Sequence, residues 1–325
     1  MKVSMRAFPV LLVLVALSVA LAAFPALAAS EGHFDRTLTV TGAVDLDVET
    51  GSGEIILRTG DSTKVEIRAK IHGSGGSEVE QRIREIENNP PIEQSGNTIR
   101  IGHIENHDWK RNISISYELI VPAQTKLRSE SGSGDQKVEG IGGPADMNSG
   151  SGSLQVKNIG NEVRVRTGSG DLKLEAIHGS VRASAGSGTI HATGIAGGLT
   201  ASSGSGNVKL EQTAAGDVDI STGSGDVEIK GVQGGAKVST GSGSITAQGD
   251  PTGDWRLHSG SGSVRVVFPS QAAFNLVARS SSGNIETSHE ISVQGNISPR
   301  ELRGKVGVGG PLVELSTSSG SIEIR

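Results

Sequence analysis

The chain contains no cysteine, which excludes disulfide bonds, thiolate metal sites and anchoring through a lipidated cysteine. Aromatic residues make up only 2% of its 325 residues, too few to fill a thick globular core. We therefore expect a thin core of Val, Ile, Leu and Ala between two closely spaced sheets. No long run of one charge sign occurs, and the formal net charge is −5. Because phosphate binding needs a basic face, nucleic acid is not expected as a partner.

The first residues have the composition of an export signal. Lys2 and Arg6 precede an apolar stretch over residues 7–23, and Ala26-Leu27-Ala28 forms a small-x-small cleavage site. We expect residues 1–28 to be removed, which takes the net charge from −5 to −7. An uncleaved membrane anchor is the alternative, but the apolar run is short for a span. The mature protein is expected to be periplasmic or extracellular, with no integral membrane segment.

Glycine, by contrast, is abundant, with 47 residues, and much of it lies in a recurring Gly-Ser-Gly triplet. Successive triplets are 18 or 19 residues apart, a short fixed period that is typical of one supersecondary unit stacked many times. The triplets begin at Gly132, Gly150, Gly168, Gly186, Gly204, Gly223, Gly241 and Gly260. Degenerate copies follow at Ser281-Ser282-Gly283 and Ser318-Ser319-Gly320, and an outlier precedes them at Gly51-Ser52-Gly53.

The residues between triplets alternate as strands do. In the coil that begins at Gly168, Leu172 and Leu174 alternate with polar residues, and Val181 and Ala183 form a second alternating run. Such alternation places one side of a strand against a core and the other in water. The sequence therefore predicts an all-β fold, a parallel β-solenoid with two short strands per coil of about 18 residues. A β-rich N-terminal region with one short helix is predicted to precede it.

The eight triplet-initial glycines are interpreted as structural turn residues. Turns this tight need positive φ or close backbone approach, and glycine tolerates both. The residue before each triplet is small or hydroxylic, as in Ser149 and Thr167, and is expected to point inward and satisfy backbone groups of the turn. On the outer face, lysine and glutamate mix along the stack, which favours a role in register and solubility over binding.

Four segments are predicted: a signal peptide (1–28), an N-terminal β-rich capping region (34–130), the solenoid repeats (131–283), and a C-terminal loop with a final degenerate coil (284–325). The helix is predicted over Glu78 to Ile86, and residues 34–130 are outside the repeat register. Pro299 to Gly310 breaks the register and is interpreted as a loop between the last two coils. The final strand would then be an exposed edge, so edge-mediated self-association is a hypothesis.

No metal, cofactor or catalytic residue is predicted. Asp135, Asp171 and Asp226 directly follow triplets, but other coils place Ser, Thr or Asn there, whereas a calcium roll needs repeated carboxylates. These acids are interpreted as turn residues. The eight histidines are scattered, and no Ser-His-Asp set is recognisable. Trp109, in what resembles a loop, is the one binding candidate, whereas the register of Trp255 points it into the core.

Residues 36–325 resemble the adhesin-type families of exported bacterial proteins built from degenerate β-strand repeats, the toastrack-like DUF4097 domains. The resemblance is carried by Ser95 to Arg100, by Tyr117 to Ala123, and by the repeated Ser-Gly-Ser-Gly coils. It implies an exported, non-enzymatic β-solenoid that mediates envelope or surface interactions with an unknown envelope protein or glycan, and it brings no site residues. A sensory or scaffold ectodomain in envelope-stress signalling is the alternative, and a polysaccharide-processing enzyme is a third reading.

Overall fold

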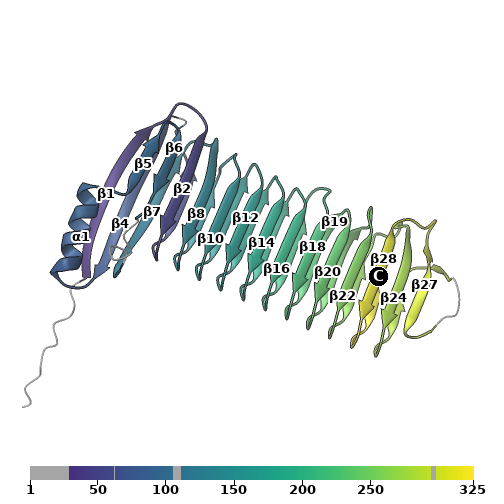
Figure 1. Ribbon diagram of the computed structural model, residues 1–325. Coiled ribbons are helices and arrows are strands. Elements are labelled where there is room, and N and C mark those ends of the chain that lie inside the picture. Colours follow the sequence, from purple (N-terminus) through teal and green to yellow (C-terminus); the bar gives the residue numbers. More distant parts are fainter. Residues whose placement is uncertain (1–28, 62, 105–110, 294–297) are drawn as a thin grey trace, which may run out of the picture.

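The computed structural model describes residues 29–61, 63–104, 111–293 and 298–325, and in them it confirms the predicted parallel β-solenoid. Short strands stack into two long sheets that face each other across a thin core, giving an elongated slab (Figure 1). One helix, α1 (Ser77–Asn88), is present in the described residues. No helix in these ranges is long and apolar enough to cross a membrane. The proposed signal peptide, residues 1–28, lies outside them.

The first sheet, called sheet 1, has fourteen strands among the described residues. Their spatial order is β1 (Ala29–Thr39), β4 (Lys64–Ser74), β7 (Ile113–Val121), β3 (Ile55–Thr59), β9 (Gln136–Glu139), β11 (Leu154–Ile159), β13 (Leu172–Ile177), β15 (Ile190–Ile195), β17 (Val208–Gln212), β19 (Val227–Gln233), β21 (Ile245–Asp250), β23 (Val264–Val267), β29 (Ile322–Ile324) and β25 (Ile285–Thr287).

The facing sheet, called sheet 2, has fifteen strands in the same part of the chain. Their order is β26 (Ile291–Val293), β27 (Glu301–Val306), β24 (Phe274–Ser280), β28 (Leu312–Thr317), β22 (Trp255–Ser259), β20 (Ala236–Thr240), β18 (Val218–Thr222), β16 (Leu199–Ser203), β14 (Val181–Ala185), β12 (Val163–Thr167), β10 (Ala145–Ser149), β8 (Thr125–Ser131), β2 (Val44–Thr50), β6 (Thr98–Ile101) and β5 (Ile92–Ser95).

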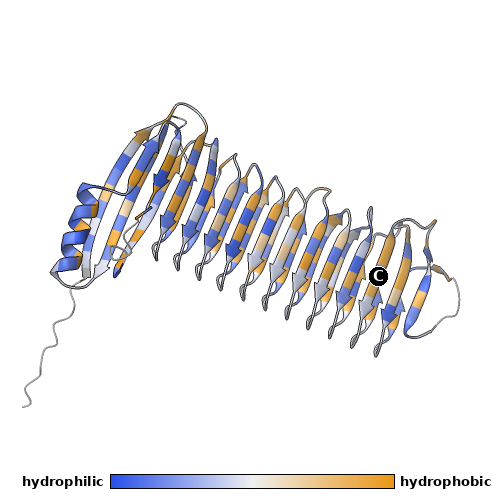
Figure 2. Ribbon diagram, viewed as in Figure 1, coloured by the Kyte–Doolittle hydropathy of each residue, from blue (hydrophilic) through white to orange (hydrophobic). Residues whose placement is uncertain are grey.

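Within the repeat, each residue pairs with the residue one coil further along. Leu154 lies opposite Leu172 in sheet 1, and Val163 lies opposite Val181 in sheet 2. The inward side chains are buried aliphatics, and the alternation of apolar and polar residues along each strand is visible in Figure 2. Trp255 is 0% exposed, as its register predicts, and its indole Nε1 donates a hydrogen bond to the carbonyl oxygen of Gly234 at 3.0 Å.

Close backbone approach, not positive φ, explains the triplet glycines. None of them is among the residues with positive φ. Instead, a Cβ placed on Gly150 would lie 2.3 Å from the carbonyl oxygen of Gly132, and one on Gly152 would lie 2.0 Å from that of Gly134. The glycines therefore let the backbone of one corner rest directly on the corner of the coil before it.

The left-handed conformation is used at the other bend of the coil, where sheet 1 returns to sheet 2. There it is adopted by Gly140, Asn158, Ala176 and Gly194 in four successive coils, and by Gly231 two coils later. Two members of this row are not glycine, Asn158 and Ala176. Asparagine can offset the strain of the left-handed conformation with a side-chain hydrogen bond, whereas Ala176, with φ of 55°, cannot.

Replacing Ala176 by glycine is therefore expected to stabilise the protein by about 1 kcal/mol, because the left-handed conformation costs an L-residue roughly that much. Urea-induced unfolding would measure the change. Ala183→Gly, at a buried position of β14, is the matched control and should instead destabilise by about 1 kcal/mol. A loss of stability in Ala176→Gly would contradict the assignment of strain to this residue.

Gly51-Ser52-Gly53, an outlier in the sequence, is the first corner of the same ladder. A Cβ on Gly132 would lie 2.4 Å from the carbonyl oxygen of Gly51. Strands β2 and β3 pair in parallel with β8 and β9, so they form the first coil of the stack. The expectation that all of residues 34–130 lie outside the register is therefore wrong for this coil. The long excursion through β4 and β7 hides the period in the sequence.

The N-terminal end of the core is covered by helix α1, which extends slightly beyond the predicted range. Its apolar face, Val79, Ile83 and Ile86, is buried against β1 and β4 (Figure 1). Sheet 1 extends past the end of sheet 2 here, and the helix covers the inner face that would otherwise be exposed. An amphipathic helix suits this place because it satisfies its own backbone hydrogen bonds.

The C-terminal coils do not stack in chain order, which corrects two expectations. Strands β28 and β29 lie between β22–β23 and β24–β25, so the final strand is internal and not an exposed edge. The segment from Pro299 to Gly310 is not a loop throughout, because it contains β27, which pairs antiparallel with β24. The outermost strands at this end are β25 in sheet 1 and β26 in sheet 2. The self-association hypothesis thus loses the edge on which it was based.

Candidate functional site

The corner that carries the triplets is satisfied by its own side chains. Thr167 donates a hydrogen bond through Oγ1 to the carbonyl oxygen of Gly152 at 2.9 Å and accepts one from the backbone N–H of Gly170 at 3.0 Å. The same two contacts recur at Ser203, at 3.1 and 2.8 Å. The inward hydroxyl row therefore closes the backbone hydrogen bonding of each turn, leaving little for a ligand.

The acids next to the triplets also bond within the stack. The Oδ1 atoms of Asp135, Asp171 and Asp226 each accept a hydrogen bond from a backbone N–H of the next coil, at 2.8 Å in all three cases. Across the described ranges, no group of three or more His, Cys, Asp or Glu side chains is placed to hold a metal ion. The geometry thus gives these carboxylates a structural role in joining coils.

The outer face of sheet 1 carries ion pairs between neighbouring coils. Lys157 contacts Glu175 at 3.1 Å, and Lys209 contacts Glu228 at 3.2 Å. Hydrogen bonds from Lys230 and Lys209 lower the pKa of the Glu228 carboxyl. Because exposed pairs of this kind contribute at most about 1 kcal/mol each, their main effect is on register. The charges within these pairs therefore neutralise each other.

A hollow lies at the C-terminal end of the stack, and we call it the C-terminal groove. It has a volume of about 750 Å³. It is formed where the bend after β23, the bend after β25 and the end of β27 meet, and residues lining it include Phe268, Gln271, His289, Ile291, Val306 and Arg325. Sheet 2 extends two strands beyond the end of sheet 1 here, and no helix of the described residues covers that extension as α1 does at the other end.

An aromatic cluster lies behind the C-terminal groove, which Phe268 lines while Trp255 and Phe274 are fully buried. The ring centroid of Phe268 lies 4.6 Å from that of Phe274 and 5.2 Å from that of Trp255. The imidazole of His289 lies 6.2 Å from the Phe274 ring, and its Nε2 atom is buried with no hydrogen-bond partner among the described residues. His289 also lines the groove, so its imidazole borders the open volume.

The groove has the His289 imidazole and the Glu290 carboxyl in its lining. In the described part of the chain, no hydrogen bond joins the His289 imidazole to a carboxylate or a hydroxyl, the contact that activates a histidine as a general base. Its lining instead combines apolar surface from Phe268, Ile291 and Val306 with polar groups from Gln271 and Arg325. That mixture is typical of sites that hold a ligand by shape and a few directed hydrogen bonds.

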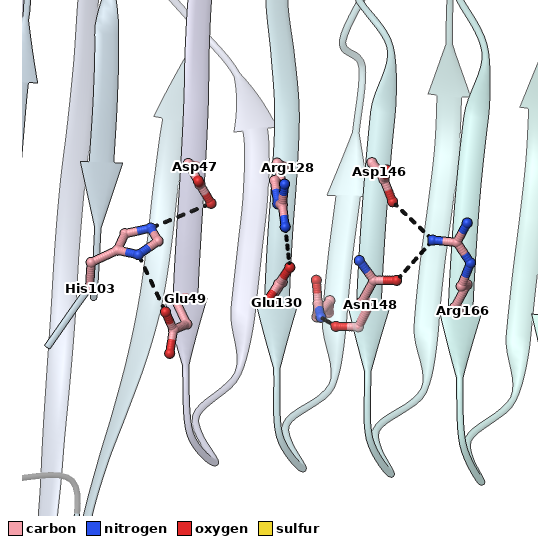
Figure 3. Close-up of polar contacts among 9 residues, drawn as sticks. Asp47, Glu49, His103, Arg128, Glu130, Asp146, Asn148 and Arg166 are labelled. Atoms are coloured by element: carbon pink, nitrogen blue, oxygen red, sulfur yellow. Dashed lines mark hydrogen bonds and ion pairs between the residues drawn. The ribbon is translucent and has the colours of Figure 1, made fainter. Parts of the chain in front are cut away.

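A second polar cluster lies on the outer face of sheet 2 near its N-terminal end. His103, which follows β6, reaches Asp47 at 3.4 Å and Glu49 at 3.3 Å, both on β2 (Figure 3). The contacts become ion pairs when the imidazole is protonated. Further along the face, Arg128 contacts Glu130 at 2.8 Å. The histidine therefore ties the segment after β6 to the first coil, a positioning role.

Tyr117, the one tyrosine of the sequence, is buried on β7, and its hydroxyl has no hydrogen-bond partner among the described residues. Its ring packs edge-on to Phe34 at 6.4 Å between centroids. Burial raises the pKa of the phenol far above its ordinary value of 10.0, and the charge of Glu49 raises it further. The neutral form is therefore strongly preferred in the folded protein.

Tyr117→Phe is expected to stabilise the protein by about 1 kcal/mol, because it removes a buried hydroxyl that has no partner. The phenol also makes the wild type sensitive to alkali. The pKa of the phenol is higher in the folded protein than its unfolded value near 10. The free energy of unfolding of the wild type is therefore insensitive to this group below pH 10 and falls as the pH rises above 10. Urea unfolding at pH 7 and pH 11 would test both effects. A wild type and variant that lose equal stability between these pH values would contradict the assignment.

The structure places the predicted site residues as follows. The triplet glycines form one long edge of the slab, resting on each other's carbonyl oxygens, and Trp109 lies outside the described residues. The C-terminal groove and the His103 cluster were not predicted. One signal was available: Trp255, Phe268 and Phe274 fall close together in a chain that is otherwise poor in aromatic residues.

Comparison with known proteins gives one family. The model described as Toastrack DUF4097 matches residues 160–325. Similar solved structures include a candidate cell adhesion protein from Clostridium sporogenes (12% identity, 91% of this chain and 99% of that one, TM-score 0.22). Others are candidate adhesins from Bacteroides fragilis (13%, 90% and 97%, 0.30) and Parabacteroides distasonis (9%, 90% and 97%, 0.32). The search of curated proteins found no match.

Proposed function

The chain belongs to the Toastrack DUF4097 family, and on that premise we propose that it is an exported, non-enzymatic β-solenoid that mediates interactions at the cell envelope or surface. The observation that carries the proposal is the C-terminal groove. It is an open volume lined by apolar and polar side chains and backed by aromatic rings, at one end of a long scaffold whose corner hydroxyls and turn carboxylates bond within the stack.

The scaffold supports this role by its shape and stiffness. Each coil is joined to the next through two strand ladders and through the corner contacts of residues such as Thr167 and Asp171. A stack of this kind resists bending, so it can hold a site at one end away from the point where the other end is attached. A binding partner, either an envelope protein or a glycan, would engage the C-terminal groove.

The test uses residues 29–325 immobilised and exposed to envelope extract and to a glycan array. Ile291→Arg places a long charged side chain in the groove, whereas Val308→Arg makes the same class of change at a position that is 92% exposed and outside the residues lining it. We expect a ligand that is retained by the wild type and by Val308→Arg and lost by Ile291→Arg. Ligands retained equally by all three proteins would overturn the proposed site.

The same protein distinguishes binding from processing. Incubation with a panel of cell-wall and matrix polysaccharides, followed by measurement of new reducing ends or unsaturated products, is expected to show no turnover. Product formation that scales with protein concentration would replace the proposal with a polysaccharide-processing enzyme.

A further inference from the structure

The outer face of sheet 2 contains two arginines that the register forces together. Pairing of β12 with β14 puts Arg164 directly opposite Arg182, and it puts Arg166 opposite Ser184. Neighbouring strands lie about 4.8 Å apart, and like charges directly opposite each other destabilise a sheet. Elsewhere on the slab, charges of opposite sign often face each other, as Lys157 and Glu175 do. Lys237 also lies opposite Arg256, but Asp219 contacts Lys237 and Asp254 contacts Arg256, at 3.6 Å in each case. The Arg164–Arg182 pair differs from that pair in the acids available to it.

The acids nearby do not neutralise the pair. Arg166 is engaged by Asp146 at 3.8 Å and by the Asn148 side chain at 3.4 Å (Figure 3). Arg164 reaches Glu162 only at 4.0 Å. No hydrogen bond or ion pair within the described residues involves Arg182. In a protein with more acidic than basic residues, an exposed arginine without a carboxylate neighbour is a site of uncompensated positive charge.

Small hydroxyl residues surround the pair on its C-terminal side. Thr200 lies directly opposite Arg182, and the row beside it continues as Ser184, Ser202, Ser221 and Ser239 on successive strands. Ser202 donates a hydrogen bond through Oγ to Ser184 Oγ at 3.1 Å, so the row lies close enough to bond along itself. The row that begins at Ser184 therefore presents short hydroxyl side chains, with Arg166 at the end of the row next to Ser184.

From this arrangement we propose that the outer face of sheet 2 binds an anionic polysaccharide, with a carboxylate or sulfate group held between Arg164 and Arg182. Guanidinium groups form paired hydrogen bonds to such oxyanions. The serine row offers hydroxyl donors and acceptors to the sugar units that follow along the stack. This site is separate from the C-terminal groove, and it stands whether or not the groove binds a partner.

The test compares two double variants of the 29–325 chain. Arg164→Ser with Arg182→Ser removes the pair, and Lys137→Ser with Lys173→Ser removes the same charge from the outer face of sheet 1. Binding to polygalacturonate, dextran sulfate and neutral dextran would be measured by biolayer interferometry at low and at physiological ionic strength.

The wild type is expected to bind at least one polyanion, and not neutral dextran, with an affinity that falls as salt rises. The arginine variant should bind at least about tenfold more weakly than the wild type, and the affinity of the lysine variant should stay within about twofold of the wild type. A preference for polygalacturonate would identify the anion as a carboxylate, and a preference for dextran sulfate would identify it as a sulfate. Absence of saturable binding by the wild type, or equal losses in both variants, would overturn the proposal.

Arg182→Glu separates loss of the site from loss of the fold. It puts a carboxylate opposite Arg164, so its melting temperature should equal or exceed that of the wild type while polyanion binding disappears. A variant that is as stable as the wild type and still binds would contradict the role given to Arg182.

Discussion

Alanine at Gly186 is expected to destabilise the protein by about 2–3 kcal/mol, whereas alanine at Gly51 should change the free energy of unfolding by less than about 0.5 kcal/mol. Both residues open a triplet. A Cβ on Gly186 would lie 2.3 Å from the carbonyl oxygen of Gly168, while a Cβ on Gly51 meets no described residue within 4 Å, since no triplet corner of the described chain lies beneath it. The obstacle at Gly186 is backbone, which cannot rotate away as a side chain would.

Urea-induced unfolding followed by circular dichroism would give the two free energies. Hydrogen exchange would show whether the damage in Gly186→Ala is concentrated in the strands that flank it, β14 and β15. Equal costs at the two positions would mean that glycine is needed for its conformational freedom, and the close-approach explanation would then be wrong.

Leu315→Asp is expected to detach the C-terminal end of the solenoid. Leu315 is fully buried in β28, which lies between β22 and β24, so an aspartate there puts an unpaired charge into the core. The local cost should exceed about 4 kcal/mol. Because β24 rests on β28 and β27 rests on β24, the loss should spread to residues that come earlier in the chain.

Hydrogen exchange and limited proteolysis of the full chain would test this. We expect protection to be lost in Phe274–Ser280 and Glu301–Val306 and kept in β10 to β18. Val308→Asp, the same kind of change at an exposed position of the same segment, is the control and should leave both regions protected. Loss confined to the last fourteen residues would mean that β24 docks on β22 without its neighbour.

The regular part of the fold could be predicted from the sequence because its information is local. The period places Leu172 and Leu174 on one side of a strand, and the next coil repeats them at Ile190 and Ala192 in the same register. The inward hydroxyls and the turn role of Asp171 follow from the same period. The reason for the glycines was only half predictable, because positive φ and close approach favour the same residue.

The candidate sites could not be predicted in this way. The C-terminal groove depends on bends after β23 and β25 that are separated in sequence and meet in the folded chain. The like-charged pair of Arg164 and Arg182 is visible in the sequence only once the strands of sheet 2 are aligned with one another. Single residues in either place carry no motif.

The sequence by itself determined that the chain stacks as a parallel solenoid, which side of each strand is buried, and that glycine occupies the corners. These properties follow from a pattern that each coil repeats, so no long-range information is needed. Only the tertiary structure decided that Gly51 starts the ladder, that the last coil in the chain is not the last in the stack, and that a groove forms at that end. Strand edges accept any partner of matching pattern, and which strands meet is therefore settled by the packing of the whole chain.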